Sequence, residues 1–183
     1  MKSRVARSIG IVVLLGACSS THHSSAPKST TTAAPQTESA RVAACSAVQL
    51  RASASLQVAT DMTGGGIWFS NIGSTPCSLQ GQASLRLADE SGRSLPVTVT
   101  HYRGSEPLAG VVTLAPHVAR GAFVTVVWWN WCTPKEPHLI QVAVPALRRW
   151  LNVKNNGFEA PRCSNPSARS VLSVGRVQAA ATP

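Results

Sequence analysis

Charged side chains are scarce in this chain of 183 residues: Asp, Glu, Lys and Arg together make up 13% of it, about half of the usual share. Aromatic residues are also few, at 5%, whereas apolar residues reach 44%. This composition excludes disorder driven by charge repulsion for the chain as a whole. Heptads of Ala, Glu, Lys and Leu are absent, which excludes a long coiled coil. The longest apolar stretch beyond the N-terminal region, Phe123 to Trp131, is less than half as long as a membrane-spanning helix requires.

The first residues are typical of a secretory signal. A basic start is followed by the apolar run Ile9 to Leu15, which is too short to span a bilayer. The sequence Leu15-Gly16-Ala17-Cys18 resembles the bacterial lipobox. That resemblance implies that residues 1–17 are a signal peptide that is removed, and that Cys18 becomes an N-terminus carrying diacylglycerol and palmitate-type acyl chains. We therefore expect a lipoprotein anchored to the extracytoplasmic side of the cell membrane; the alternative is a plain secreted protein in which Cys18 is incidental.

The segment after the predicted anchor has the composition of a tether. From Ser19 to Ala44 the chain consists mainly of Ser, Thr, Ala and Pro, with few bulky apolar side chains. Such a segment cannot bury enough surface to offset the entropy lost on ordering. Residues 18–44 are therefore predicted to be a disordered tether that holds a folded domain close to the membrane.

The chain is basic, with 17 Lys and Arg against 7 Asp and Glu and a net charge of +10. The densest group of cations is Arg148, Arg149, Lys154 and Arg162. A basic surface can bind nucleic acid, but a lipid anchor would place this one beside anionic headgroups and wall polymers. We expect no nucleic-acid partner, and a solvated basic face with no partner is the simpler interpretation.

From Cys45 onward the pattern changes to that of strands. Leu50 to Val58 alternates between apolar and polar residues with a period of two, as in a half-buried strand. Gly64 to Gly66 predicts a turn, and further apolar runs bounded by turn residues predict strands near residues 67–72, 85–88, 95–102, 111–114, 123–131, 139–144 and 171–177. Seven to nine short strands at this spacing predict an antiparallel immunoglobulin-like β-sandwich over residues 45–178, followed by a tail of residues 179–183.

Four cysteines lie in the predicted domain: Cys45, Cys77, Cys132 and Cys163. An even number in an exported domain predicts two disulfides, with three possible pairings. No C-x-x-C spacing is present, which disfavours a zinc site. We favour Cys45–Cys77 with Cys132–Cys163, because each bridge would close a short loop and tie a sheet margin to the body of the domain. A Cys77–Cys132 bridge, like the inter-sheet bond of antibody domains, is the alternative.

A series of short motifs in this domain resembles a family of actinobacterial domains. The motifs are, in order, Cys45 to Leu50, Phe69 to Gly81, Ser91-Gly92, Thr113 to Pro116, Trp128 to Cys132, and a late Cys163. Their order is similar to that of the domain of unknown function DUF4232, common in mycobacterial-type lipoproteins, and the resemblance covers residues 45–178. It implies an envelope location and the architecture, but no activity. The chain departs from the pattern at Gln82, where the family tends to have an aromatic residue, and at His117, where glycine is usual.

No motif for catalysis or cofactor binding is present. The chain has no G-x-S-x-G elbow, phosphate-binding loop or dinucleotide fingerprint, and the domain's acids lie in turn-like segments. His101, His117 and His138 lack the H-x-x-x-H spacing of metal ligands. We therefore expect no enzyme, metal or cofactor, and we interpret the domain as a non-catalytic binding or structural domain for an envelope glycan, lipid or protein. The alternative is a hydrolase acting on cell-wall material, which a cleft lined by a carboxylate pair or a histidine–acid pair would favour over an aromatic groove.

Tryptophan is the one unusual feature, with five residues against a single tyrosine. Strand alternation over Phe123 to Trp131 would place Trp129 and Trp131 on one face and Trp128 on the other. Packing in the core beside a disulfide is one interpretation, and a platform for sugar rings or acyl chains is the other.

A segment later in the chain could cover that platform. Pro145 to Pro161 carries enough apolar side chains to act as a flap over Trp129 and Trp131, with its arginines facing solvent. The candidate ligand-binding residues are accordingly Trp129, Trp131, Trp150, Arg148 and Arg149, and the expected ligand is an amphiphile with an anionic head.

Overall fold

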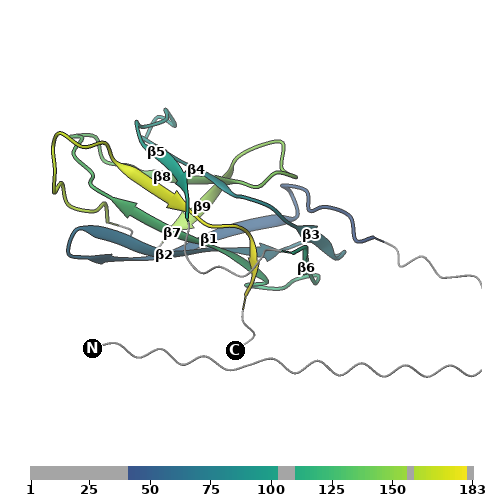
Figure 1. Ribbon diagram of the computed structural model, residues 1–183. Helices are drawn as coiled ribbons and strands as arrows, with labels where there is room; N and C mark the ends of the chain where they lie inside the picture. The colour runs from purple at the N-terminus through teal and green to yellow at the C-terminus, as the bar shows by residue number, and fades with distance from the viewer. Residues whose placement is uncertain (1–40, 103–109, 156–158, 181–183) are drawn as a thin grey trace, which may run out of the picture. The chain divides into compact units, whose positions relative to one another are not determined.

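The computed structural model describes residues 41–102, 110–155 and 159–180 (Figure 1). The predicted signal peptide, Cys18 and most of the predicted tether and tail lie outside these residues. The described chain contains strands and no helix, so the predicted all-β class is confirmed. The strands are β1 (Leu50–Ala59), β2 (Met62–Asn71), β3 (Cys77–Leu79), β4 (Ser84–Ala88), β5 (Thr98–His101), β6 (Val112–Leu114), β7 (Ala122–Trp129), β8 (Leu139–Ala143), β9 (Leu151–Asn155), β10 (Val171–Val174) and β11 (Gln178–Ala179).

The first hairpin differs from the expected one at its glycines. β1 and β2 pair along their whole length, from Leu50 opposite Asn71 to Ala59 opposite Met62. The turn therefore falls at residues 60–61, and Gly64 to Gly66 lie inside β2. The prediction of a turn at these glycines is wrong, because their pairing with both neighbouring strands keeps the backbone extended.

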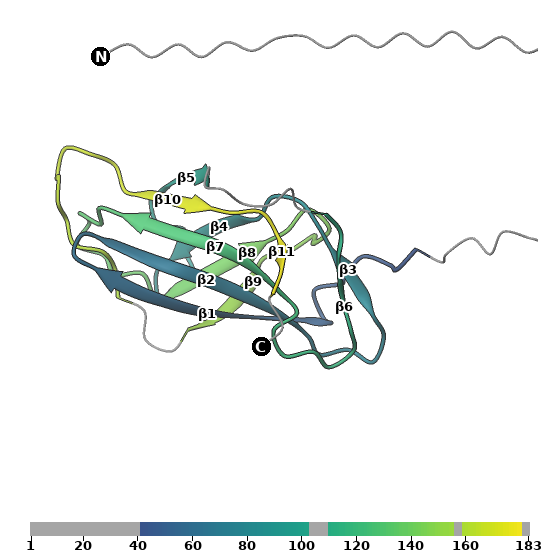
Figure 2. The ribbon, with the colours of Figure 1, turned by 60° about the horizontal axis from the view of Figure 1, so that its bottom comes forward.

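Nine strands form one sheet in the order β4-β8-β9-β1-β2-β7-β10-β5, with β11 also pairing with β7, while β3 and β6 pair separately. Figure 2 shows β1, β2, β7 and β10 side by side. Most pairs are antiparallel, as predicted, but β1 runs parallel to β9 and β10 runs parallel to β5. The described residues hold more strands than the predicted seven to nine, because several pieces of two or three residues pair at the margins.

The sheet curls until its two ends approach each other. β4, at one end of the strand order, contacts both β10 and β5, at the other end. An antiparallel bridge joins Gln82 to Arg176, and Gln82 Nε2 donates hydrogen bonds to the carbonyls of Val174 (2.7 Å) and Gly175 (2.9 Å). These pairings describe one nearly closed, curled sheet, so the immunoglobulin-like sandwich stays a prediction.

The core fills the inside of this curl. Ile67 and Phe69 of β2, and Val124, Val126 and Trp128 of β7, are at most 1% exposed. They alternate with residues that face outward, as the two-residue period of a strand requires. Residues 39–183 form one compact unit, and the described strands, both disulfides and the core cluster lie inside it. This part of the chain therefore carries the described fold.

The strand directions define two ends of the curled sheet (Figure 1). At the proximal end, where the described chain begins at Arg41, Leu50 lies opposite Asn71. At the distal end, Met62 lies opposite both Ala59 and Trp129. The proximal segments are 41–49, 72–83, 110–121, 144–150 and 175–180, and the distal segments are 60–61, 89–97, 130–138 and 159–170.

One disulfide, Cys45–Cys77, ties the start of the described chain to β3 at the proximal end. Backbone hydrogen bonds reinforce the tie, since the Cys45 N–H donates to the Ser78 carbonyl and the Ser78 N–H donates to the Ala43 carbonyl. The other disulfide, Cys132–Cys163, lies at the distal end. Both predicted bridges are confirmed, and the alternative Cys77–Cys132 pairing is excluded. Each closes a loop of about 30 residues and contributes roughly 3–4 kcal/mol on the chain-entropy model.

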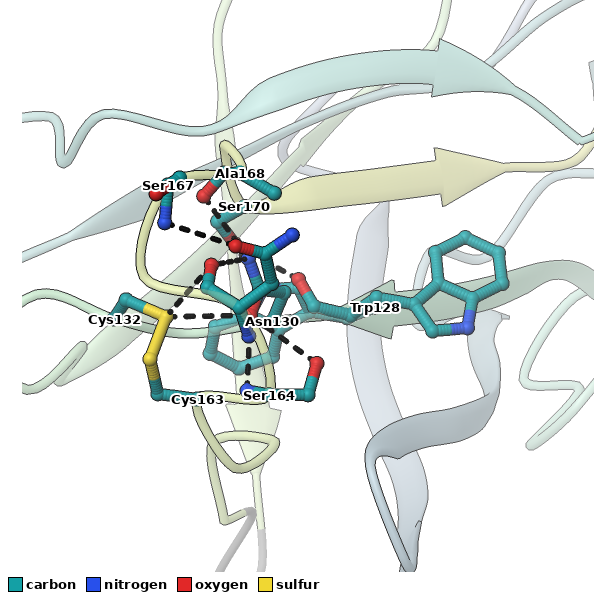
Figure 3. Close-up of a disulfide and its surroundings, with 10 residues drawn as sticks. Trp128, Asn130, Cys132, Cys163, Ser164, Ser167, Ala168 and Ser170 are labelled. Carbon is teal, nitrogen blue, oxygen red and sulfur yellow. Dashed lines mark hydrogen bonds between the residues drawn. A yellow bond between two sulfur atoms is a disulfide. The ribbon is translucent and has the colours of Figure 1, made fainter.

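Asn130 organises the distal end around the second disulfide (Figure 3). Its φ of 62° lies in the left-handed region, and the residue is only 6% exposed. Its Oδ1 accepts the backbone N–H groups of Ser164 (3.0 Å) and Asn165 (2.9 Å). Its Nδ2 donates to the carbonyls of Asn165 and Ala168, both at 2.9 Å. One amide therefore satisfies four backbone groups and holds residues 164–168 against the end of β7.

Replacing this amide tests its role. Asn130→Ala should lower the free energy of unfolding by about 3 kcal/mol. It leaves the backbone partners of the amide unpaired, and it places alanine in the left-handed region, where a Cβ is unfavourable. Asn130→Gly loses the same hydrogen bonds but relieves the backbone, so it should be about 1 kcal/mol more stable than Asn130→Ala. Urea unfolding of the three oxidised proteins measures both differences. Equal stability of the wild-type and alanine proteins would contradict the assignment.

Candidate functional site

The tryptophans at the end of β7 separate into different environments. Trp128 is 1% exposed and lies in the core with Val124 and Val126, as alternation predicted. Its Nε1 donates to the Ser170 hydroxyl at 2.8 Å. Trp129 points to the opposite face and is half-buried.

Trp131 does not share a face with Trp129. The left-handed backbone of Asn130 ends β7 and turns the chain, so the period of two fails at this residue. Trp131 is 7% exposed and packs edge-on against Trp128, with ring centroids 5.2 Å apart. Its Nε1 donates to the Lys135 carbonyl. The prediction of a shared face was wrong, and Trp131 belongs to the core.

Residues 145–155 of the predicted flap, Pro145 to Pro161, do not cover β7. They include β9, a strand between β8 and β1, and β1 and β2 separate it from β7. Residues 159–161, at the end of the segment, line a pocket together with Trp131. Trp150, half-buried just before β9, lies under the Arg86 guanidinium, which is 4.8 Å from the ring centroid. Arg148 and Arg149 are exposed in the turn between β8 and β9. The structure therefore does not bring these three residues together with Trp129 and Trp131.

An aromatic pair that the sequence did not reveal lies on the outer face of the sheet. Trp68 of β2 is directly opposite Phe123 of β7, and both side chains point away from the core. Their rings are stacked with centroids 6.5 Å apart and an interplanar angle of 28°. Both residues are only partly buried, so part of the aromatic surface remains accessible.

Arg120 completes this feature. Its guanidinium carbon lies 5.0 Å from the centroid of the Trp68 ring, a distance at which a cation is attracted to the ring face. The backbone positions Arg120 beside β2, since the Asn71 N–H donates to the Val118 carbonyl and the Ser70 hydroxyl donates to the Ala119 carbonyl. Arg120 is exposed, so its N–H groups can reach a ligand.

The three side chains line a groove of about 980 Å³ at the proximal end, which we call the Trp68 groove. Its remaining walls are mainly apolar side chains and backbone from β6, the turn before β7, and the end of β11. They are Val111, Val112, Thr113, Ala115, Val118, Ala119, Gly121, Ala179 and Ala180. Arg120 is the one charged residue among the lining residues, so the groove is apolar with a positive margin.

The glycines of β2 leave room for the Trp68 ring. A Cβ on Gly66 would lie 3.2 Å from the far edge of the indole, which shows that the ring extends back over this residue. A Cβ on Gly64 would make only an ordinary contact, 3.6 Å from Met62 Cε. The absence of a side chain at Gly66 thus permits the orientation of Trp68 that forms one wall of the groove.

A second depression, at the distal end, gathers carboxylates and a histidine, the residue types that the hydrolase alternative requires. It is shallow and is lined by Asp89, Glu90, Ser91, Lys135, Glu136 and His138. The Ser91 hydroxyl donates to Asp89 Oδ1 at 2.6 Å, as does the Arg93 N–H at 2.9 Å. These bonds lower the pKa of the Asp89 carboxyl, because they stabilise its ionised form.

A metal site and a membrane-spanning helix were the other features considered for the part of the chain that the structure describes. Its His, Cys, Asp and Glu side chains form no group of three or more that could hold a metal ion. It also contains no helix of the length and apolarity needed to cross a membrane. The Trp68 groove is therefore the main candidate site.

Comparison with known proteins gives a match to one family model. The model is described as a domain of unknown function, DUF4232, and it matches residues 45–178. No curated protein and no solved structure matches the chain. The matched range includes both disulfides and nearly all of the residues that line the Trp68 groove.

The fit between Gly66 and Trp68 can be tested with a matched pair of substitutions. Gly66→Ala should lower the free energy of unfolding by about 1 kcal/mol, because the new methyl group displaces the indole. Gly64→Ala adds the same group where space exists, so it should leave stability unchanged or slightly raised. Thermal unfolding of both variants provides the measurement, and equal effects would show that the indole does not rest on Gly66.

Proposed function

We propose a non-catalytic binding function for this chain, which belongs to the DUF4232 family, a family whose description assigns it no activity. The observation that carries the proposal is the Trp68 groove, an accessible, largely apolar surface with one cation at its margin. Such a combination of apolar walls with a few placed polar groups is typical of small-molecule binding sites.

The chemistry of the groove favours an amphiphile with an anionic head. Apolar side chains and the ring of Phe123 would cover a hydrocarbon portion, while the exposed guanidinium of Arg120 would donate charge-assisted hydrogen bonds to a phosphate or carboxylate. None of the described residues that line the groove is an acid that would oppose a negative charge. A glycan is less favoured, because one face of the Trp68 ring is next to Arg120 and the ring also stacks on Phe123.

We also propose that the protein lies in the cell envelope. The basic start, the short apolar run and the Leu15-Gly16-Ala17-Cys18 sequence support a lipoprotein anchored through Cys18 on the extracytoplasmic side of an actinobacterial membrane. Two disulfides within the domain support the same compartment, because such bonds persist in oxidising surroundings. An amphiphile of the envelope would then be available to the groove.

An immunoglobulin-like sandwich is the finer fold that we propose for the domain. Its support is the approach of β4 to β5 and β10, which makes opposite halves of the curled sheet face each other across the core. A hydrolase acting on cell-wall material is the second candidate function. Its support is limited to the shallow acidic depression, in which Asp89 is committed to local hydrogen bonds.

Titration with single-chain lipids tests the groove. Lysophosphatidylglycerol, kept below its micelle concentration, should give a saturable change in tryptophan fluorescence, and Trp68→Ala should abolish that change. Arg120→Gln should weaken binding of this anionic lipid about tenfold, since it removes a charge-assisted contact. Lysophosphatidylcholine, which has no net charge, should bind the wild type and Arg120→Gln proteins equally.

The control for this titration is Trp150→Ala, which removes a half-buried tryptophan outside the groove. It should leave the affinity for lysophosphatidylglycerol unchanged. An equal loss in the Trp150→Ala and Trp68→Ala proteins, or no saturable change in the wild type, would refute the proposed site.

Processing at Cys18 gives a separate test of location. Cys18→Ala should prevent lipid attachment, so the variant should keep the mass of the unprocessed chain and lose the acyl groups found by mass spectrometry in the wild type. Globomycin, an inhibitor of lipoprotein signal peptidase, should block cleavage of the wild type. Unchanged mass and membrane extraction behaviour in Cys18→Ala would contradict the lipoprotein assignment.

A further inference from the structure

The charges of the described residues are divided unequally between the two ends of the domain. All five described acids lie in the distal segments: Asp61, Asp89, Glu90, Glu136 and Glu159. The proximal segments contain no acid, yet they carry Arg41, Arg120, Arg148, Arg149 and Arg176. The distal segments balance their acids with Arg93, Lys135, Arg162 and Arg169. Among the described residues, the proximal end is therefore strongly positive and the distal end nearly neutral.

Exposed apolar side chains are concentrated at the same end. Of the six large hydrophobic residues that the described chain exposes, four belong to proximal segments: Val42 (38% exposed), Val48 (71%), Ile72 (44%) and Val111 (62%). Apolar residues at such positions remain in contact with water unless a partner covers them. Arginines interspersed with exposed valine and isoleucine are the pattern of a surface that meets anionic lipid headgroups and the acyl boundary below them.

We infer that the proximal end docks on the surface of an anionic lipid bilayer. The positive charge attracts the headgroups, and the exposed valines and isoleucine enter the interfacial layer. The described chain begins at this end, at Arg41, so an anchor at Cys18 would be joined to the domain from the docking side. This contact is separate from the proposed ligand in the Trp68 groove, and it requires neither that ligand nor lipidation.

The placement of the groove makes the docking useful. Val111 and Arg120 belong both to the proximal end and to the lining of the Trp68 groove. Docking would bring the mouth of the groove to the level of the headgroups, where an amphiphile could enter without crossing water. The distal end, whose described charges nearly cancel, would face away from the bilayer.

Vesicle sedimentation with residues 39–183 tests the docking without any anchor. The protein should sediment with vesicles of phosphatidylcholine mixed with phosphatidylglycerol, and remain in solution with phosphatidylcholine alone. Arg148→Glu combined with Arg149→Glu should lower the partition coefficient at least about tenfold, because each arginine contributes to the attraction. Arg162→Glu combined with Arg169→Glu makes the same change in net charge at the distal end and should have little effect. All four arginines are exposed, so both variants should keep the wild-type unfolding temperature.

A further variant separates this inference from the proposed function. Val48→Ser should weaken vesicle binding, because it removes the most exposed apolar side chain, and it should leave the lysolipid titration unchanged, because Val48 does not line the Trp68 groove. Equal losses from the proximal and distal double variants would show a general charge effect and overturn the docking face. Wild-type protein that stays in solution with anionic vesicles would overturn it as well.

Discussion

The pairing of β2 with β7 is the interaction on which the rest of this structure depends. The two strands are in register over eight residue pairs at the centre of the curled sheet. On one face this register packs Ile67 and Phe69 with Val124 and Val126 to form the middle of the core. On the other face it places Trp68 beside Phe123 and creates the Trp68 groove. A shift of one residue would exchange the two faces, so the core and the proposed site are fixed together.

Features set by local pattern could be predicted from the sequence. Alternation identified the all-β class and placed Trp128 and Trp129 on opposite faces of the sheet, and the disulfide pairing followed from short loop closure. The face on which Trp131 lies could not be predicted, because Asn130 has a left-handed backbone that ends β7 and breaks the two-residue period. His117 also lies in the left-handed region, with a φ of 58° that glycine adopts without strain, which agrees with the glycine that the resemblance implied at this position.

The groove was missed for a different reason. Trp68 and Phe123 lie on strands that are distant in the sequence, and only the strand order makes them neighbours. Nothing local distinguishes Trp68 from the other four tryptophans. Conversely, Trp150 and its neighbouring arginines suggested a cluster with Trp129, but the parallel pairing of β9 with β1 carries them to another part of the sheet. Long-range strand order, rather than any residue preference, decides which aromatic side chains can act together.

The parallel pair of β1 and β9 has a consequence for how the chain acquires its fold. β1 joins residues 52–54 to residues 153–155, so one edge of the first hairpin finds its partner only after most of the domain has been made. The other edge of that hairpin, on β2, waits for β7. Contacts so distant along the chain slow folding, and unpaired strand edges invite association with other chains. Both edges of the first hairpin therefore acquire their partners only from segments that are made much later.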